Sequence, residues 1–257
     1  MNKIDELFNK ARKPILSIYL TAGYPELESL KVLLPALEKS GVDMVEIGMP
    51  FSDPLADGPV IQESSQVALR NGMNLELLFQ QLSELITSMP MILMGYLNPV
   101  IQFGLSRFLQ KSRECGISGT ILPDLPVQEY LKYRDEFEIN GIHNILLVTP
   151  QSSPERIKYL AGISKGFLYL VSSASTTGTK SFADADSSYF DRIREMDLGI
   201  PGMIGFGVRT KKDFERAGQL ASGAIIGTQF IKHLQPAVEN VDINAEKLAT
   251  EFVKGFR

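Results

Sequence analysis

Residues 45–62 read VEIGMPFSDPLADGPVIQ, and this stretch begins as a β-strand. In the alternation of a strand, Glu46 lies on the same face as the apolar side chains of Val42 and Met44. A carboxyl group in such surroundings loses much of its hydration, which raises its pKa and suits it to proton transfer near neutral pH. The pattern therefore predicts either a catalytic acid or base at Glu46 or a buried structural carboxylate paired with Lys or Arg.

Directly after this strand, residues 49–61 form a predicted loop that carries two acidic side chains, Asp53 and Asp57. Its three prolines and Gly58 are incompatible with a continued strand, and the prolines stiffen the loop. Asp57-Gly58 is also the sequence of an ordinary turn. A buried acid at a strand end, followed by a stiff acidic loop, is typical of an active site, and we favour that interpretation.

Short apolar runs alternate with amphipathic, helical segments along the whole chain. This order, without a linker or a change of composition, predicts one α/β domain over residues 1–257. Eight strands fit a closed (β/α)8 TIM barrel better than an open doubly wound sheet. Glycines just before several strands predict left-handed helix ends, at Gly41, Gly116, Gly141 and Gly166. The predicted strands are ILSIYL (15–20), VDMVEIG (42–48), MILMGY (91–96), ISGTIL (117–122), HNILLV (143–148), GFLYLV (166–171), GMIGFG (202–207) and GAIIG (223–227).

The N-terminal segment MNKIDELFNKAR predicts an extra amphipathic helix in front of the barrel, with Ile4, Leu7, Phe8 and Ala11 on one face. Its charges distinguish it from a signal peptide. No apolar run reaches the ~18 residues that a membrane span needs. We therefore expect a soluble, cytoplasmic protein that has no membrane partner.

The composition narrows the possible chemistry. A net charge of −4, without a stripe of Lys or Arg, argues against a nucleic-acid partner. Cys115 is the single cysteine, which excludes a disulfide framework, and we interpret it as a buried apolar residue. The only histidines, His143 and His233, stand apart from other potential ligands, so we expect no metal site. Proton transfer would then depend on carboxylates or tyrosines.

A second long loop, residues 172–186, follows the sixth predicted strand. The two long loops thus follow strands 2 and 6 at their C-terminal ends. In a barrel this end carries the active site, so the two loops predict a site with a lid. A tolerated surface insertion is the alternative interpretation of residues 172–186.

Glycines mark the ends of the seventh and eighth predicted strands, in GFG (205–207) and in Gly227-Thr228. Barrels commonly bind phosphate there, where backbone N–H groups and a helix N-terminus point at the anion. The segment TQFIKHL (228–234) predicts such a helix. Glycine allows the backbone itself to approach the ligand. Gly178, in the second long loop, could close over the same phosphate.

The stretch PFSDPLADGP resembles the signature of the tryptophan synthase alpha subunit. Six other segments occur in that family's order and at about its spacing. These segments are YLTAGYP (19–25), MGYLNPV (94–100), GTILPDLP (119–126), YLVSSASTTG (169–178), GFGV (205–208) and GAIIGT (223–228). The resemblance covers nearly the whole chain, and an uninterrupted match of this length is far more specific than a lone glycine motif.

The resemblance implies a role for each matching position. Glu46 and Asp57 would be the two catalytic carboxylates. The residues that would form the indole pocket are Tyr19, Met94, Ile121, Tyr169 and Phe206. The residues that would hold the phosphate of the substrate are Gly178, Gly207, Gly227 and Thr228, the last in place of the family's usual Ser. Ser173 stands where the family frequently has Arg, which leaves open how residues 172–186 close. From strand alternation alone, Tyr169 would be a core residue.

The activity implied by the resemblance is that of a lyase in L-tryptophan biosynthesis. It is the retro-aldol cleavage of indole-3-glycerol phosphate to indole and glyceraldehyde 3-phosphate. The implied partner is a beta subunit in an α2β2 heterotetramer; pyridoxal phosphate would belong to that partner, and this chain would carry no cofactor. Two alternatives are a free-standing lyase that releases indole and a catalytically silent allosteric activator of a beta subunit. Retention of Glu46 and Asp57 argues against the silent activator.

Overall fold

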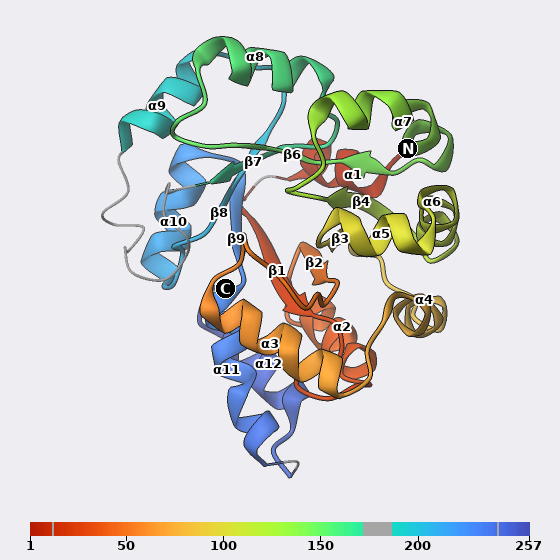
Figure 1. Ribbon diagram of the computed structural model, residues 1–257. Coiled ribbons are helices and arrows are strands. Elements are labelled where there is room, and N and C mark those ends of the chain that lie inside the picture. The colour runs from red at the N-terminus through yellow and green to blue at the C-terminus, as the bar shows by residue number, and fades with distance from the viewer. Residues whose placement is uncertain (12, 172–186, 241) are drawn as a thin grey trace.

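The computed structural model describes residues 1–11, 13–171, 187–240 and 242–257. Within them, nine parallel strands form one sheet in the order β5-β4-β3-β2-β1-β9-β8-β7-β6 (Figure 1). The strands are β1 (Ile15–Thr21), β2 (Met44–Gly48), β3 (Met91–Met94), β4 (Ile117–Ile121), β5 (His143–Asn144), β6 (Leu146–Val148), β7 (Leu168–Val171), β8 (Gly202–Gly205) and β9 (Gly223–Ile226). Each of the eight predicted strands overlaps an observed one, and the predicted strand 143–148 overlaps two, β5 and β6.

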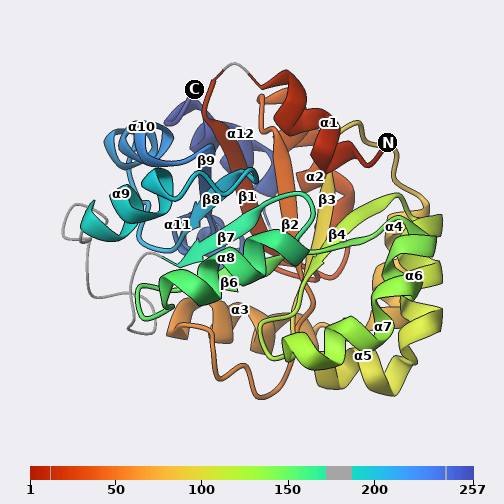
Figure 2. The same ribbon diagram turned by 90° about the horizontal axis from the view of Figure 1, so that it is seen from above.

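The sheet closes on itself through the predicted strand 143–148. The two ends of the strand order, β5 and β6, are consecutive pieces of this stretch, separated by Ile145 alone. The first piece pairs with β4 and the second with β7. The result is a barrel, seen from above in Figure 2, and the predicted TIM-barrel fold is confirmed.

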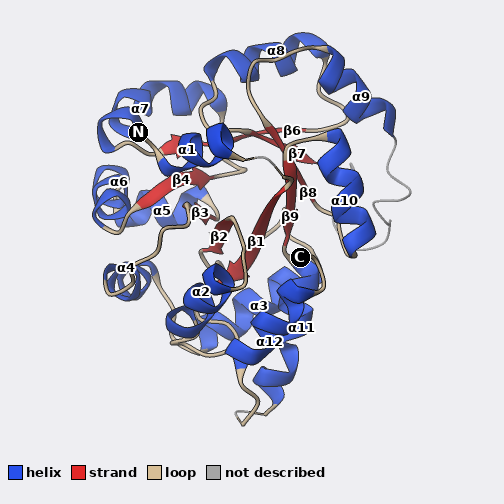
Figure 3. Cartoon of the chain, turned by 180° about the vertical axis from the view of Figure 1, so that it is seen from behind, coloured by secondary structure: helices blue, strands red, loops and turns tan. Residues whose placement is uncertain are grey.

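Helices surround the barrel, as the view from behind shows (Figure 3). They cover the outer face of strands that are almost continuously buried, which is the pattern of a parallel sheet covered on both faces. The helices of the described residues are α1 (Lys3–Lys10), α2 (Leu30–Lys39), α3 (Pro59–Arg70), α4 (Leu75–Ser83), α5 (Leu97–Phe103), α6 (Leu105–Glu114), α7 (Val127–Asn140), α8 (Pro154–Ile163), α9 (Ser187–Glu195), α10 (Lys211–Leu220), α11 (Thr228–Glu239) and α12 (Ala245–Lys254).

The predicted extra helix, α1, lies at the end of the barrel where the strands begin. Ile4 is completely buried, and its methyl carbons lie 3.0 Å from the position that a Cβ would take at Gly119 and at Gly166. The side-chain amide of Asn2 donates hydrogen bonds to the carbonyl oxygens of Ser118, at 2.7 Å, and Gly141, at 2.8 Å. Both contacts hold α1 against the β4 side of the barrel.

Two boundaries differ from the predictions at the N-terminus and after β2. Ala11 follows the end of α1 at Lys10 and is exposed, so it does not belong to the packed face of the helix. The first long loop ends at Gly58 rather than at residue 61, because Pro59 begins α3. Proline fits the first position of a helix, where its missing N–H would have no partner. Residues 49–58 are called the Asp57 loop from here on, and residues 172–186 lie outside the described residues.

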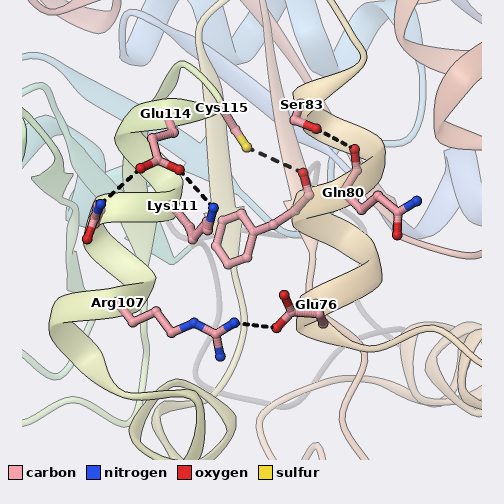
Figure 4. A network of polar contacts seen from close by, with 9 residues as sticks. Glu76, Gln80, Ser83, Arg107, Lys111, Glu114 and Cys115 are labelled. Carbon is pink, nitrogen blue, oxygen red and sulfur yellow. Dashed lines mark hydrogen bonds and ion pairs between the residues drawn. The ribbon is translucent and has the colours of Figure 1, made fainter.

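Three of the four predicted left-handed helix ends and the predicted environment of Cys115 are confirmed. Gly41, Gly116, Gly141 and Gly166 have φ angles of +87°, +71°, +70° and +76°. Gly166 is left-handed as well, but α8 ends earlier, at Ile163, with Ser164 as its C-cap. Cys115 is buried where α4 and α6 face each other, and its thiol lies 3.4 Å from the carbonyl oxygen of Phe79 (Figure 4). The same two helices are joined by an ion pair of 2.7 Å between Arg107 and Glu76.

Candidate active site

Glu46 lies in β2, in register with Tyr19 of β1 and Ile92 of β3. Its side chain is completely buried, and neither carboxyl oxygen has a hydrogen-bond partner among the described residues. Burial raises the pKa of Glu46 to about 8, because the charged form has lost its hydration. The described parts of the chain thus give no support to the alternative of a structural ion pair, and the predicted desolvated carboxyl group is confirmed.

The Glu46 carboxyl group faces the interior of the barrel. Burial raises the pKa of the Tyr169 hydroxyl in β7, and the charges of Glu46 and Asp57 raise it further. In the sheet, β2 and β7 are separated by β1, β9 and β8. Side chains of these two strands can therefore interact only across the interior, which brings Tyr169 and both predicted catalytic carboxylates into one site.

Asp57 stands at the end of a turn in the Asp57 loop, where its N–H donates to the carbonyl oxygen of Pro54 at 3.0 Å. The hydroxyl of Tyr96 donates to Asp57 Oδ2 at 3.1 Å and accepts from the N–H of Ala56 at 2.9 Å. Burial raises the pKa of Asp57 to about 6, and the hydrogen bond from Tyr96 opposes this rise. Asp57 is thus a fixed carboxylate that is ionised at neutral pH.

Two interior tyrosines reach over glycines on neighbouring strands. A Cβ at Gly48 would lie 2.1 Å from the hydroxyl oxygen of Tyr19, and a Cβ at Gly205 would lie 2.0 Å from that of Tyr169. The absence of a side chain at these glycines therefore provides the space in which the phenol groups lie. Burial raises the pKa of Tyr19, with a further contribution from Asp57, so the phenol stays protonated at neutral pH.

A small pocket opens where Asp57 and Tyr19 meet. The residues that line it are Tyr19, Met49, Phe51, Pro54, Asp57, Ser65, Met94, Gly95, Tyr96 and Pro123. Of the predicted indole-pocket residues, Tyr19 and Met94 belong to this lining. The other three are not part of the lining. Ile121 is in register with Met94, the pKa of Tyr169 is raised by burial and further by Asp57 and Tyr19 of the lining, and Tyr169 packs against Phe206 with ring centroids 5.9 Å apart.

Sequence reasoning missed Tyr96, which holds Asp57, and Phe51, whose ring lies 5.3 Å from that of Tyr96. One signal was available. Tyr96 follows Met94 by two residues at the C-terminal end of a predicted strand, where a barrel carries its functional side chains.

Three of the four predicted phosphate residues, Gly207, Gly227 and Thr228, lie at the C-terminal ends of two adjacent strands, β8 and β9. Phe206 and Gly207 follow β8 with φ angles of +71° and +80°. Gly227 is the N-cap of α11, which begins at Thr228, so the predicted helix is confirmed. The first N–H groups of a helix have no partner within it and suit an anion. Gly178 and Ser173 lie outside the described residues.

The comparisons with known proteins agree with this geometry. The family model for the tryptophan synthase alpha chain matches residues 6–256. The tryptophan synthase alpha chain of Flavobacterium psychrophilum is 52% identical over 238 residues, which cover 91% of this chain and 94% of that one. The chain belongs to the tryptophan synthase alpha chain family. Membership makes it a lyase, the alpha subunit that cleaves indole-3-glycerol phosphate in tryptophan biosynthesis.

Solved structures of the tryptophan synthase alpha chain family share the fold. The crystal structure of the alpha chain from Legionella pneumophila has a TM-score of 0.88 and 32% identity, covering all of this chain and 96% of that one. A structure of Mycobacterium tuberculosis tryptophan synthase has a TM-score of 0.86 and 29% identity, covering all of this chain and 98% of that one.

The described residues of this alpha chain contain neither a metal-binding cluster nor a helix that could span a membrane. Among them, no three His, Cys, Asp or Glu side chains are grouped so that they could hold a metal ion. Within the same ranges, every helix is too short or too polar to cross a membrane.

Proposed function

We propose that Glu46 and Asp57 carry out the cleavage of indole-3-glycerol phosphate to indole and glyceraldehyde 3-phosphate. The observation that carries this proposal is the state of Glu46, a completely buried carboxyl group with a pKa of about 8. Asp57 lies in the loop that follows β2, and, in addition to burial, the charges of both carboxylates raise the pKa of Tyr169. A group that holds its proton near neutral pH can both give and take one in a catalytic cycle.

In the proposed chemistry, Glu46 alone gives the proton and takes one back. Protonated Glu46 gives its proton to C3 of the indole ring, which leaves a cation that is shared with the ring nitrogen. The resulting carboxylate takes the proton of the hydroxyl next to the scissile bond. The electrons of that O–H bond form the aldehyde as the carbon–carbon bond breaks, and the electrons of the broken bond restore the aromatic ring. Glu46 ends the cycle protonated, as it began.

Asp57 would stabilise the cation of this cycle by accepting the N–H of the ring. A fixed carboxylate stabilises a developing charge best in a water-poor site, where no reorganisation is needed. Asp57 meets both conditions, since it is held by Tyr96 and has lost enough hydration through burial to raise its pKa. The indole ring would lie among Tyr19, Met94 and the residues beside them: Ile121, Tyr169 and Phe206.

We assign the phosphate to the backbone at Gly207, Gly227 and Thr228. Two strand ends and the start of α11 support this assignment. Gly178 is added to this assignment only because of the resemblance to the family. The phosphate is remote from the breaking bond, so its binding energy can position the substrate.

For the assembly, we propose an α2β2 heterotetramer with a beta subunit, in the cytoplasm, with this chain acting as one domain. A similar structure is that of M. tuberculosis tryptophan synthase, which supports a synthase complex. The proposed steps need only proton transfer and charge stabilisation, so we assign no cofactor to this chain. Pyridoxal phosphate would belong to the beta subunit.

The experiment that tests this function follows indole and glyceraldehyde 3-phosphate formed from indole-3-glycerol phosphate, with the chain alone and with a beta subunit. Equal amounts of both products, formed faster in the complex, would support the proposal. Equally fast release without a partner would instead indicate a free-standing lyase. No cleavage in either case, together with a more active beta subunit, would indicate the silent activator.

A further inference from the structure

The turn that carries Asp57 is held by hydrogen bonds from a side chain of the following helix. Gln62 lies in the first half of α3, and its side-chain amide donates to the carbonyl oxygen of Asp57 at 2.8 Å. The same amide lies 3.4 Å from the carbonyl oxygen of Pro54, the residue at which the turn begins. One amide group therefore joins the two ends of the turn.

Tyr96 holds the same turn from the opposite element. Its hydroxyl accepts from the N–H of Ala56 and donates to the carboxylate of Asp57. Asp57 is thus held twice, through its side chain by a residue that follows β3 and through its carbonyl oxygen by a residue of α3. These two contacts fix independent parts of the residue, which leaves little freedom for rotation of the carboxylate.

The turn needs such support because little else holds its tip. Leu55, at the tip, is 86% exposed, so the turn has no apolar anchor of its own there. A catalytic group must stay within about 0.5 Å of its productive position, and misplacement by about 1 Å can cost a factor of ~10² in rate.

We propose that Gln62 is a positioning residue for Asp57. Through its hydrogen bonds to the turn, Gln62 keeps the Asp57 carboxylate directed at the ring nitrogen. Gln62 is not expected to contact the substrate. The inference rests on the proposed role of Asp57. Its consequence is that the rate of cleavage depends on a polar group on the outside of the barrel.

Two substitutions of Gln62 separate the effect of its hydrogen bonds from the effect of its size. Gln62→Ala removes the donor, and we expect kcat to fall about fivefold, the effect of one neutral hydrogen bond, with KM little changed. Gln62→Glu keeps the size but places a carboxylate against two carbonyl oxygens. Because these groups repel one another, kcat should fall further than in Gln62→Ala at pH 7.5.

The matched control is Gln66, one turn further along α3 and also exposed. Its amide donates to the carbonyl oxygen of Ser52 at 3.2 Å and does not contact the turn. Gln66→Ala and Gln66→Glu should each lower kcat less than twofold. Equal losses at the two glutamines would overturn the proposal, because a general loosening of the Asp57 loop would then explain both.

The decisive readout is the same series made in the Asp57→Asn background of the full chain. If Gln62 acts through the Asp57 carboxylate, Gln62→Ala should change the residual rate of Asp57→Asn less than twofold. A fivefold loss in that background as well, or no loss in the wild-type background, would overturn the inference. The proposed function fails separately, if Asp57→Asn itself leaves the rate of cleavage unchanged.

Discussion

Tyr96 donates a hydrogen bond to Asp57 Oδ2 at 3.1 Å, across 39 positions of sequence. The bond joins the end of a core strand to the Asp57 loop, which ties the acidic loop to the rigid part of the barrel. It also favours the charged form of the carboxylate. Burial raises the pKa of Asp57 to about 6, and the bond from Tyr96 keeps it from rising further.

Tyr96→Phe should shift the acid side of the pH–rate profile to higher pH. The proposed mechanism needs ionised Asp57, so activity falls as the pH drops through its pKa of about 6. Without the O–H donor, the charged form loses stabilisation and this pKa rises. Measurements of kcat between pH 5 and pH 8 test the shift. Tyr159→Phe, on exposed Tyr159 of α8, is the control and should leave the profile in place.

In Glu46→Gln, the free energy of unfolding should depend less on pH than it does in the wild type. The pKa of Glu46 rises from 4.5 to about 8 in the fold, so the folded state binds this proton more tightly than the unfolded state. Its contribution to stability is complete below pH 4.5 and is lost as the pH rises through about 8. The free energy of unfolding of Glu46→Gln should therefore rise relative to that of the wild type as the pH increases through this range, by up to about 5 kcal/mol.

Urea unfolding of both proteins at pH 5, 7 and 8.5 measures this difference. Groups other than Glu46 titrate in both proteins and cancel in the comparison. Unfolding free energies that run parallel over the three pH values would mean that Glu46 is not the desolvated acid described above.

Much of this site follows from local sequence patterns, because alternation and loop chemistry are local properties. Glu46 in a buried strand and the glycine ends of β8 and β9 are examples. The start of α3 at Pro59 also had a signal, since proline favours the first turn of a helix. The contact of Tyr96 with Asp57 and the position of Tyr19 over Gly48 could not be predicted from local patterns. Both contacts depend on which strands become neighbours and on how far a loop folds back.

Gly48→Ala should displace Tyr19 from the pocket. The new Cβ would lie 2.1 Å from the hydroxyl oxygen of Tyr19 and 2.6 Å from its ring carbon Cζ, so the phenol must move. Overpacking of this kind typically costs about 1–3 kcal/mol in stability, and indole should bind more weakly. Thermal unfolding and indole titration measure the two effects. Gly162→Ala, where a Cβ meets nothing within 4 Å, is the control and should not weaken indole binding.

The phosphate assignment predicts unequal effects at Thr228 and Gly207. Thr228→Ala leaves the backbone donors in place and removes only a hydroxyl donor to the anion, so it should weaken the binding of glycerol 3-phosphate by about 1.5–3 kcal/mol. Gly207→Val should weaken it far more, because a branched side chain would occupy the path of the anion. Titration calorimetry with glycerol 3-phosphate measures both.

Gly41→Val controls for backbone strain in this comparison. Gly41 has a φ of +87°, close to the +80° of Gly207, and lies before β2 at the opposite end of the barrel. It should destabilise the fold without changing phosphate affinity. If Gly207→Val bound glycerol 3-phosphate as the wild type does, the phosphate site would have to lie elsewhere.

The most direct test of the account is the single-turnover rate of indole release from indole-3-glycerol phosphate, compared between the wild type and Glu46→Gln. The amide keeps the shape of the carboxyl group but cannot transfer its proton. We predict that Glu46→Gln stays folded, still binds glycerol 3-phosphate and releases indole ~10²–10⁴-fold more slowly. Indole release at a rate near that of the wild type, by a folded Glu46→Gln protein, would contradict the central role of Glu46.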